Sequence, residues 1–373
     1  MKFTINKDEF IKGLLNVTKI VQPKNVNPIL TTVRMILDNS GLNLTGSNGD
    51  LAITQTIPLF RGDKEIIRDV RQGGVLVNAK IISDIARKID GNEITFELID
   101  DSVAKIANEK TCFKLNSIRV EEYQDIDFSK TGSAIKFKRV DYINAINEVA
   151  FAAAIKDTRP TLTAINFLGE NNTLTLAATD GARLASKKMD LEITNRFNAN
   201  IPSKALVEST KSLTDEEFIT LYISDKKVLI ELKDCEIVSR LISGEYPSIR
   251  NIIPKTFYYY LEVNANELIN AMDRISLLSN EQEKVVKITM TETKVEVSSS
   301  SQQVGSAVET LNVFKYQGER LEISFNSDFV TNAIRSLKSE DVLISFIGEM
   351  KPFTVTNKND PNTIQVITPV RTY

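Results

Sequence analysis

Apolar side chains follow one spacing pattern three times along the chain. In each copy a short alternating segment contains an anchor residue, and apolar residues follow five, six, nine and twelve positions after it. The anchors are Ile5, Phe137 and Val263. Alternation predicts a β-strand, and the three- and four-residue spacing predicts an amphipathic helix. The positions concerned are Phe10, Ile11, Leu14 and Val17; Tyr142, Ile143, Ile146 and Val149; and Leu268, Ile269, Met272 and Ile275.

A second strand-to-helix pattern recurs later in each copy. It spans residues 75–89, 201–213 and 323–337, and enters the helix through Asn78, Pro202-Ser203 or Asn326-Ser327. Further alternating runs lie between and after the two helices, at 42–44, 174–176 and 295–297, and at 94–96, 219–221 and 342–344. Each copy therefore predicts strand, helix, antiparallel strands, helix and more strands, which is an α+β unit. The predicted helices are 7–19, 79–90, 138–155, 203–213, 264–277 and 327–338.

Asn6, Asp141 and Asn264 lie near the first predicted helix start of each copy and carry side chains that cap helices. The repeat predicts three domains, residues 1–128, 129–256 and 257–373, joined by short junctions without low-complexity linkers. A stiff array of similar domains follows. The alternative is an α+β chain whose amphipathic segments are alike only through composition.

Composition excludes several classes of function. The 373 residues include no His and only two cysteines, Cys112 and Cys235. Catalysis by His-activated nucleophiles, His-ligated zinc and Cys-rich metal sites is therefore excluded, and no disulfide scaffold is expected. The longest apolar run, 149–155, is too short to span a bilayer, and the N-terminus lacks the apolar core of a signal peptide. These features predict a cytoplasmic protein.

Charge is sorted weakly between helices and the rest of the chain. The net charge is −3, yet the six predicted helices carry 13 Lys and Arg against 10 Asp and Glu. A nucleic-acid partner would need such sorting onto one surface.

Possible catalytic features are weak. The segment 41–47 has the glycine spacing of a phosphate-binding loop but lacks the following Lys, and it lies in a strand pattern. Acidic residues gather at Asp100-Asp101, at Asp125 with Asp127, and at 215–217 without a complementary set of ligands. Neither a metal site nor a cofactor is predicted. The alternative hypothesis, a nuclease or nucleotidyltransferase, would require metal-dependent turnover.

Local motifs from one end of the chain to the other are specific. They are Met1-Lys2-Phe3-Thr4-Ile5, Pro28-Ile29-Leu30, Ala178-Thr179-Asp180-Gly181-Ala182-Arg183-Leu184, Gly244-Glu245-Tyr246-Pro247, Leu277-Leu278-Ser279-Asn280-Glu281 and Pro369-Val370-Arg371-Thr372-Tyr373. With the triplicated unit, they make the chain resemble the bacterial DNA polymerase III beta subunit family, the sliding clamps. This resemblance implies a non-catalytic processivity factor that encircles duplex DNA without sequence specificity.

The resemblance further implies a head-to-tail homodimer that closes a ring of six domains, with helices lining the hole and sheets outside. Closure would pair the free sheet edges that a linear array leaves exposed. The implied dimer contact joins Phe113 and Leu115 to Leu277 and Leu278 of a second copy. The basic positions implied to face DNA are Lys24, Lys80, Arg87, Lys156, Arg159 and Lys204. Phosphate contacts of this kind position DNA without reading its bases.

The segment 179–184 has no close counterpart by residue type at 47–50 or 300–303. In the family it helps to build an apolar cleft that captures short peptides from the replicative polymerase alpha-type subunit, clamp-loader subunits, and repair polymerases or ligase. The positions that match are Leu162, Thr179, Gly181, Arg183, Leu184, Pro247, Ile252, Asn326, Phe329, Ile367, Thr368, Pro369, Val370 and Arg371. Ala182 and Asn251 differ from residues that some relatives carry, so peptide preference is open.

A second reading is a repeat-built adaptor that binds only proteins and never encircles DNA. The clamp reading predicts a nucleoid-associated cytoplasmic protein with no membrane partner. Linear DNA with blocked ends distinguishes the two, because an encircling clamp stays on blocked DNA and leaves when one end is freed.

Overall fold

The structure is a computed structural model that describes residues 1–100, 102–279, 284–301 and 303–371. Asp101, Asn280, Glu281, Thr372 and Tyr373, which belong to motifs named above, lie outside the described residues. Contacts within the chain define two compact units. Unit 1 consists of Met1–Arg139 and Glu208–Leu241, and unit 2 of Val140–Val207 and Ile242–Tyr373.

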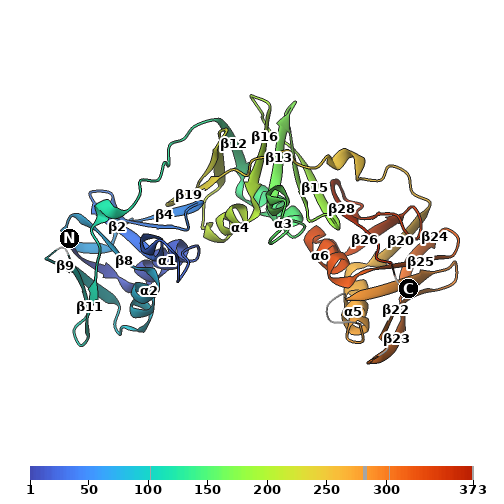
Figure 1. The fold of residues 1–373 in the computed structure, drawn as a ribbon, viewed down its shortest axis with the longest axis horizontal. Helices are drawn as coiled ribbons and strands as arrows, with labels where there is room; N and C mark the ends of the chain where they lie inside the picture. The colour runs from blue at the N-terminus through green and yellow to red at the C-terminus, as the bar shows by residue number, and fades with distance from the viewer. Residues whose placement is uncertain (101, 280–283, 302, 372–373) are drawn as a thin grey trace. The chain divides into compact units, whose positions relative to one another are not determined.

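Six α-helices occur in the part of the chain that the structure describes, at the six predicted places (Figure 1). They are α1 (Lys7–Thr18), α2 (Ala79–Lys88), α3 (Arg139–Ala150), α4 (Ser203–Ser212), α5 (Ala265–Ser276) and α6 (Ser327–Leu337). Asn6 and Asn264 cap α1 and α5 as expected: the Asn6 Oδ1 accepts from the Glu9 N–H at 3.2 Å, and the Asn264 side chain accepts from two N–H groups.

The predicted helix 138–155 was too long. α3 ends at Ala150, because the next N–H groups bond to carbonyls three residues back and the Ala154 N–H then bonds to the Leu162 carbonyl at 2.9 Å. The chain therefore turns toward the short 3-10 helix η3 (Pro160–Thr163). Asp141 lies in the first turn of α3 and not before it, so it is not the cap residue that we expected.

Unit 1 contains two large antiparallel sheets and a small hairpin. Their strand orders are β11-β10-β9-β1-β7, β12-β17-β18-β19-β4-β3-β2-β8 and β5-β6. The bounds are β1 (Lys2–Asn6), β2 (Thr32–Asp38), β3 (Gly41–Ser47), β4 (Leu51–Pro58), β5 (Phe60–Arg61), β6 (Lys64–Glu65), β7 (Ile67–Arg71), β8 (Gly73–Asn78), β9 (Glu93–Ile99), β10 (Val103–Ala107), β11 (Cys112–Asn116), β12 (Ser133–Lys138), β17 (Phe218–Ile223), β18 (Lys227–Glu231) and β19 (Cys235–Arg240).

Unit 2 contains the other two sheets. Their orders are β16-β13-β14-β15-β28-β27-β26-β20-β24 and β23-β22-β21-β25. The bounds are β13 (Ala164–Glu170), β14 (Thr173–Thr179), β15 (Arg183–Asp190), β16 (Phe197–Pro202), β20 (Tyr259–Asn264), β21 (Val285–Met290), β22 (Val295–Ser301), β23 (Gly305–Thr310), β24 (Val313–Gln317), β25 (Leu321–Asn326), β26 (Asp341–Phe346), β27 (Phe353–Asn357) and β28 (Asp360–Ile367).

The strand pairing joins successive repeats into continuous sheets. In unit 1, β4 of the first repeat pairs with β19, the last strand of the second, so that Ala52 lies opposite Val238. In unit 2, β15 of the second repeat pairs with β28, the last strand of the third, so that Leu184 lies opposite Val366. Three tandem clamp-type domains of α+β class are thus linked through their sheet edges.

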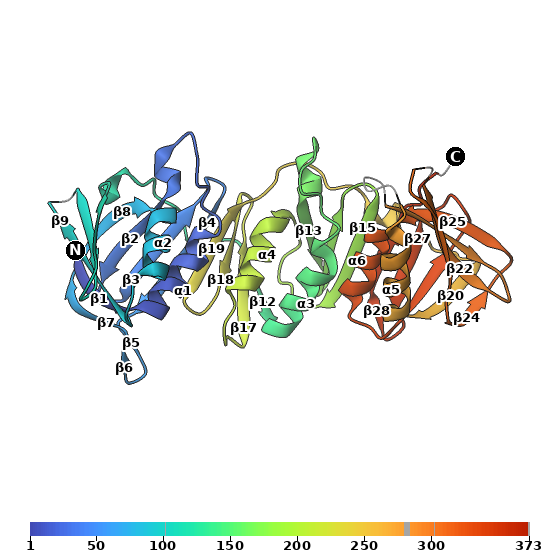
Figure 2. The same ribbon diagram turned by 90° about the horizontal axis from the view of Figure 1, so that it is seen from below.

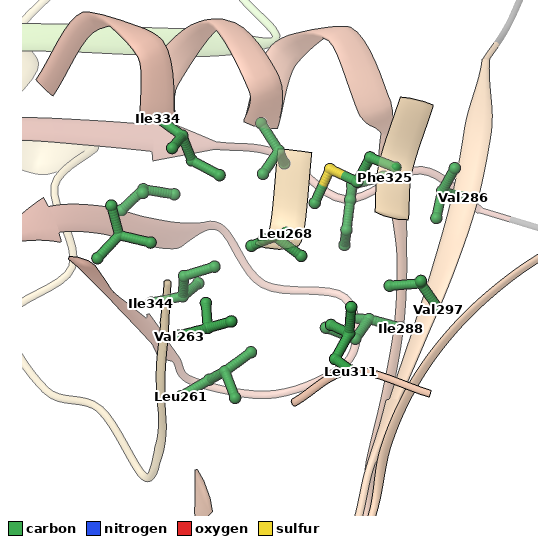
Figure 3. Close-up of a cluster of buried hydrophobic side chains, with 14 of the residues drawn as sticks. Leu261, Val263, Leu268, Val286, Ile288, Val297, Leu311, Phe325, Ile334 and Ile344 are labelled. Carbon is green, nitrogen blue, oxygen red and sulfur yellow. The ribbon is translucent and has the colours of Figure 1, made fainter. Parts of the chain in front are cut away.

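Paired helices cover the sheets within each unit. α1 and α2 lie side by side in unit 1, as do α5 and α6 in unit 2 (Figure 2). The periodic apolar positions point into the cores as predicted: Phe10, Leu14 and Val17 are fully buried on α1. Figure 3 shows the third repeat, where Leu268 of α5 and Ile334 of α6 face Val263 and Ile344 of the sheet. The residues at offsets five, nine and twelve are therefore buried in all three copies, whereas Ile11 and Ile143, at offset six, are half-buried.

Candidate functional site

The hairpin between β14 and β15 is fixed by its own side chains. The Thr179 hydroxyl donates to the Arg183 carbonyl at 2.6 Å and accepts from the Gly181 N–H at 3.0 Å. The Asp180 Oδ1 accepts from the N–H groups of Ala182 and Arg183, both at 3.0 Å. Gly181 has φ +92°, a conformation that favours glycine. The turn therefore holds the start of β15 in one geometry.

Arg183 is the charged centre of this turn. Its Nε donates to the Asp180 Oδ2 at 3.0 Å, and the side chain is 14% exposed. The guanidinium lies 4.5 Å from the ring centroid of Phe329 and 5.4 Å from that of Phe151. Its Nη1 is buried and has no hydrogen-bond partner among the described residues. A held guanidinium that keeps some exposed surface is suited to binding a carbonyl or carboxylate oxygen.

The chain after β28 lies against the same turn. Ile367 pairs with Arg183 across the sheet, and the Thr368 N–H donates to the Ala182 carbonyl at 2.9 Å. Two residues later the Val370 N–H donates to the Ser324 carbonyl at 2.8 Å. The start of α6 is close to Arg183 as well, since the ring of Phe329 stacks under its guanidinium.

Most of the predicted peptide-binding residues come together in unit 2. Thr179, Gly181, Arg183, Leu184, Asn326, Phe329, Ile367, Thr368 and Val370 belong to the turn, to α6 with its cap, or to the chain beside them. Leu162 lies in η3, next to a loop in which Arg159 approaches Gly181. Leu162, Leu184 and Ile367 are 1–2% exposed, so they are core side chains of unit 2. Pro247, Ile252, Pro369 and Arg371 are half-buried or exposed.

Sequence reasoning missed three residues that organise the site. Phe151 stacks on Arg183, Asp180 orients it, and Tyr246 is buried before Pro247. Asp180 and Tyr246 stood in the quoted motifs, but Phe151 had no signal beyond an apolar side chain after a helix.

The turn at 179–184 does have a counterpart, contrary to the expectation from residue type. At 47–51 the Gly49 N–H donates to the Ser47 hydroxyl at 3.0 Å, and the Asn48 Oδ1 accepts from two following N–H groups. The expectation was wrong because Ser-Asn-Gly and Thr-Asp-Gly offer the backbone the same acceptors in the same order.

The basic residues expected to face DNA are exposed in both units. In unit 1, Lys80 and Arg87 on α2 line a hollow of about 170 Å³ together with Pro23, the neighbour of Lys24. In unit 2, Lys156, Arg159 and Lys204 are exposed. Arg159 lies 3.1 Å from Asp157, and its hydrogen bonds lower the pKa of that carboxyl.

The residues expected at a dimer contact lie at free sheet edges or beside a helix end. Phe113 and Leu115 are half-buried on β11, the edge strand of the five-stranded sheet. Leu277 directly follows α5 and is 78% exposed, and Leu278 is half-buried.

The acidic clusters form ion pairs with basic residues. Asp127 lies 2.7 Å from Lys227, and hydrogen bonds from Lys227 and Ser129 lower its pKa. Asp215 lies 2.9 Å from Lys233. Among the described residues, no group of three or more Asp, Glu or Cys side chains is placed to hold a metal ion. No described helix is long and apolar enough to cross a membrane.

Three tandem domains joined edge to edge, each with two helices backed by antiparallel sheets, define a DNA sliding clamp. Family models of the DNA polymerase III beta subunit match residues 1–127 (N-terminal domain), 136–248 (central domain) and 250–371 (C-terminal domain). The chain therefore belongs to the DNA polymerase III beta subunit family. It is a non-catalytic processivity factor of DNA replication.

Similarity to individual relatives extends over the whole chain. The beta sliding clamp of Bacillus subtilis is 34% identical and that of Halalkalibacterium halodurans 32% identical, each with complete coverage of both chains. The solved sliding clamp of Bacillus subtilis matches with a TM-score of 0.94 at 34% identity. The solved DNA polymerase III beta chain of Streptococcus pneumoniae matches with a TM-score of 0.93 at 29% identity. Both structures are covered completely, as is this chain.

Proposed function

We propose that two copies of the chain close head to tail into a six-domain ring around duplex DNA. The observation that carries this is the order of strands in the sheets. In each of the two joined sheets, four strands of one repeat continue into four strands of the next repeat. The order is β8-β2-β3-β4 into β19-β18-β17-β12 in unit 1, and β16-β13-β14-β15 into β28-β27-β26-β20 in unit 2. The two remaining sheets are the separate halves of a third such sheet: β25-β21-β22-β23 and β11-β10-β9-β1.

The third sheet becomes whole when β23 of one copy pairs with β11 of another. Both are edge strands in the described chain, and unpaired edges are a liability that proteins cover. Apolar side chains accompany them, Phe113 and Leu115 on β11 and Leu277 and Leu278 after α5. A head-to-tail contact that closes satisfies both edges.

Exposed basic residues on helices and on the loops that follow them hold the duplex inside this ring without reading its sequence. They are Lys24, Lys80, Arg87, Lys156, Arg159 and Lys204. Enclosure keeps the DNA threaded, so weak and salt-sensitive phosphate contacts suffice and sliding stays possible. The domains are residues 1–128, 129–256 and 257–373, and the protein works on the nucleoid in the cytoplasm. The family-model match to residues 1–127 supports the first boundary, whereas the match to the C-terminal domain begins at residue 250, before the proposed second boundary.

The Arg183 region is the docking site for peptide tails of the replicative polymerase, clamp-loader subunits, and repair polymerases or ligase. The half-buried Phe329 and the guanidinium that lies against its ring support this assignment. Bound peptides would place an apolar side chain beside Phe329 and a carbonyl or carboxylate on Arg183.

The test is retention on DNA with blocked ends. A purified clamp loader places the protein on linear duplex DNA whose ends carry bulky protein blocks. We expect retention in high salt until one block is cut away, and then loss within the dead time of the assay. A protein-only adaptor would show no dependence on the ends, and that result would refute encirclement.

A further inference from the structure

A cavity lies in unit 1, at the junction of the first and second repeats. It has a volume of about 320 Å³. Its walls come from η1 (Pro28–Thr31), the β3–β4 turn, the segment 122–127 after η2 (Val120–Glu122), and the ends of β18 and β19. Nothing in the proposed ring or in the Arg183 region uses this cavity.

The cavity is built on the same frame as the Arg183 region in unit 2. The Thr31 hydroxyl donates to the Pro28 carbonyl at 2.7 Å, as Thr163 does to Pro160 at 2.8 Å. The Arg240 N–H donates to the Asp50 carbonyl at 3.0 Å, as the Thr368 N–H does to Ala182 at 2.9 Å. Ser47, Asn48 and Gly49 repeat the bonds of Thr179, Asp180 and Gly181. Both junctions therefore present the same backbone frame.

The floor of this cavity is apolar. Ala52 and Val238 belong to a small buried cluster with Leu229, and Ile126 packs against it. Leu30 and Leu51 add apolar surface to the lining. The floor therefore suits a leucine- or phenylalanine-sized side chain.

One wall carries an unused donor. Tyr123 is 6% exposed, lines the cavity, and its hydroxyl has no hydrogen-bond partner in the described part of the chain. Burial raises the pKa of Tyr123 to about 12, so the hydroxyl stays protonated. The hydroxyl oxygen is itself buried, so it forms part of the wall and is not exposed to an incoming chain.

The rim is acidic where the Arg183 region is basic. Four carboxylates line the cavity, those of Asp50, Glu122, Asp125 and Asp127, against the two cations Lys227 and Arg240. Lys227 forms an ion pair with Asp127 at 2.7 Å. The Asp50 and Asp125 side chains are 80% and 106% exposed, at 3.6 and 3.9 Å from their nearest arginine nitrogens. Glu122 pairs with Arg119 at 3.2 Å. The Asp50 and Asp125 ion pairs are long and exposed, so these two carboxylates can exchange their arginine for a basic side chain of a ligand.

We propose that this cavity is a second peptide-binding site of the clamp. It takes a short extended segment of a partner protein, with an apolar anchor flanked by lysines or arginines. The anchor lies on Ala52 and Val238, and the basic flanks pair with Asp50 and Asp125. Partners with opposite charge patterns can then bind one clamp at the same time.

The test uses the full-length protein and two labelled probe peptides in fluorescence anisotropy. One probe carries Leu-Phe between pairs of lysines, and the other carries Leu-Phe between pairs of glutamates. We expect the lysine-flanked probe to bind at least tenfold more tightly at low salt, with affinity that falls as salt rises. Equal affinity for both probes, or no binding of either, would overturn the proposal.

Matched variants locate the binding. The double variant Asp50→Lys/Asp125→Lys should weaken the lysine-flanked probe at least tenfold, because it reverses both rim charges at exposed positions. The control Asp63→Lys/Asp190→Lys makes the same change in net charge at exposed positions away from the cavity and should leave affinity within twofold. Equal losses in both variants would mean general charge attraction and would refute the site. Arg183→Ala should leave this probe unaffected; a large loss would place it in the Arg183 region instead.

Discussion

Truncation of Leu277 to alanine should open the proposed ring. The side chain is 78% exposed in the chain by itself, and a partner copy would cover it. Leu277→Ala removes about three methylene-sized groups, each contributing about 0.8 kcal/mol when buried. Scaled by the exposed fraction, the loss is about 2 kcal/mol per interface. A closed dimer has two interfaces, so the loss doubles to about 4 kcal/mol, or about a thousandfold in the dissociation constant.

Sedimentation equilibrium across nanomolar to micromolar concentrations measures this change. Val26→Ala is the matched control, because Val26 is an apolar side chain that is 102% exposed in the loop after α1. It should leave the dissociation constant unchanged. A Leu277→Ala protein that dimerises as tightly as the parent would show that this residue lies outside any interface.

Further outcomes follow from ionisable groups that are wholly or partly buried in the described chain. Lys187→Met removes the cation that pairs with Glu148 and Asp360, whose carboxylates lie 2.9 and 2.7 Å from the lysine nitrogen. Urea denaturation should show that the free energy of unfolding falls by about 3 kcal/mol. Burial opposes both charges, yet these hydrogen bonds raise the pKa of Lys187 and lower that of Asp360. The stabilisation in the parent should therefore fade as pH drops below about 4 and as it rises past about 10.5, and the variant's profile should lack both changes. Burial raises the pKa of Cys235 to about 12, so Ellman's reagent should leave this thiol unmodified until guanidinium unfolds the chain.

The repeat could be predicted from sequence because burial has a short period. Phe10, Leu14 and Val17 must face the core of one helix whatever its neighbours are, so their spacing is visible locally. The pairing of β4 with β19 and of β15 with β28 could not be predicted in this way. An alternating strand shows which face is buried but not which edge it meets.

The same distinction between local and long-range determinants applies to the Arg183 region. The side chains that accept hydrogen bonds in the 179–184 turn lie within the turn itself, and a glycine at position 181 favours a positive φ. The orientation of Arg183 is not local, because it depends on Phe151 and Phe329, which come from other elements of unit 2. The end of α3 also depended on a bond to Leu162 that no helical periodicity contains.

The two repeat junctions share one backbone frame but differ in the side chains that surround it. Leu51 occupies the place of Arg183, and the positions that match Phe151 and Phe329 in the repeat are Lys19 and Ala205. An arginine at position 51 would therefore lack both stacking partners that order Arg183, and the first junction kept an apolar residue there. Its charge lies instead on the exposed rim, at Asp50 and Asp125. Sheet continuity demands the same turn at both junctions, whereas the side chains around that turn are free to select different ligands.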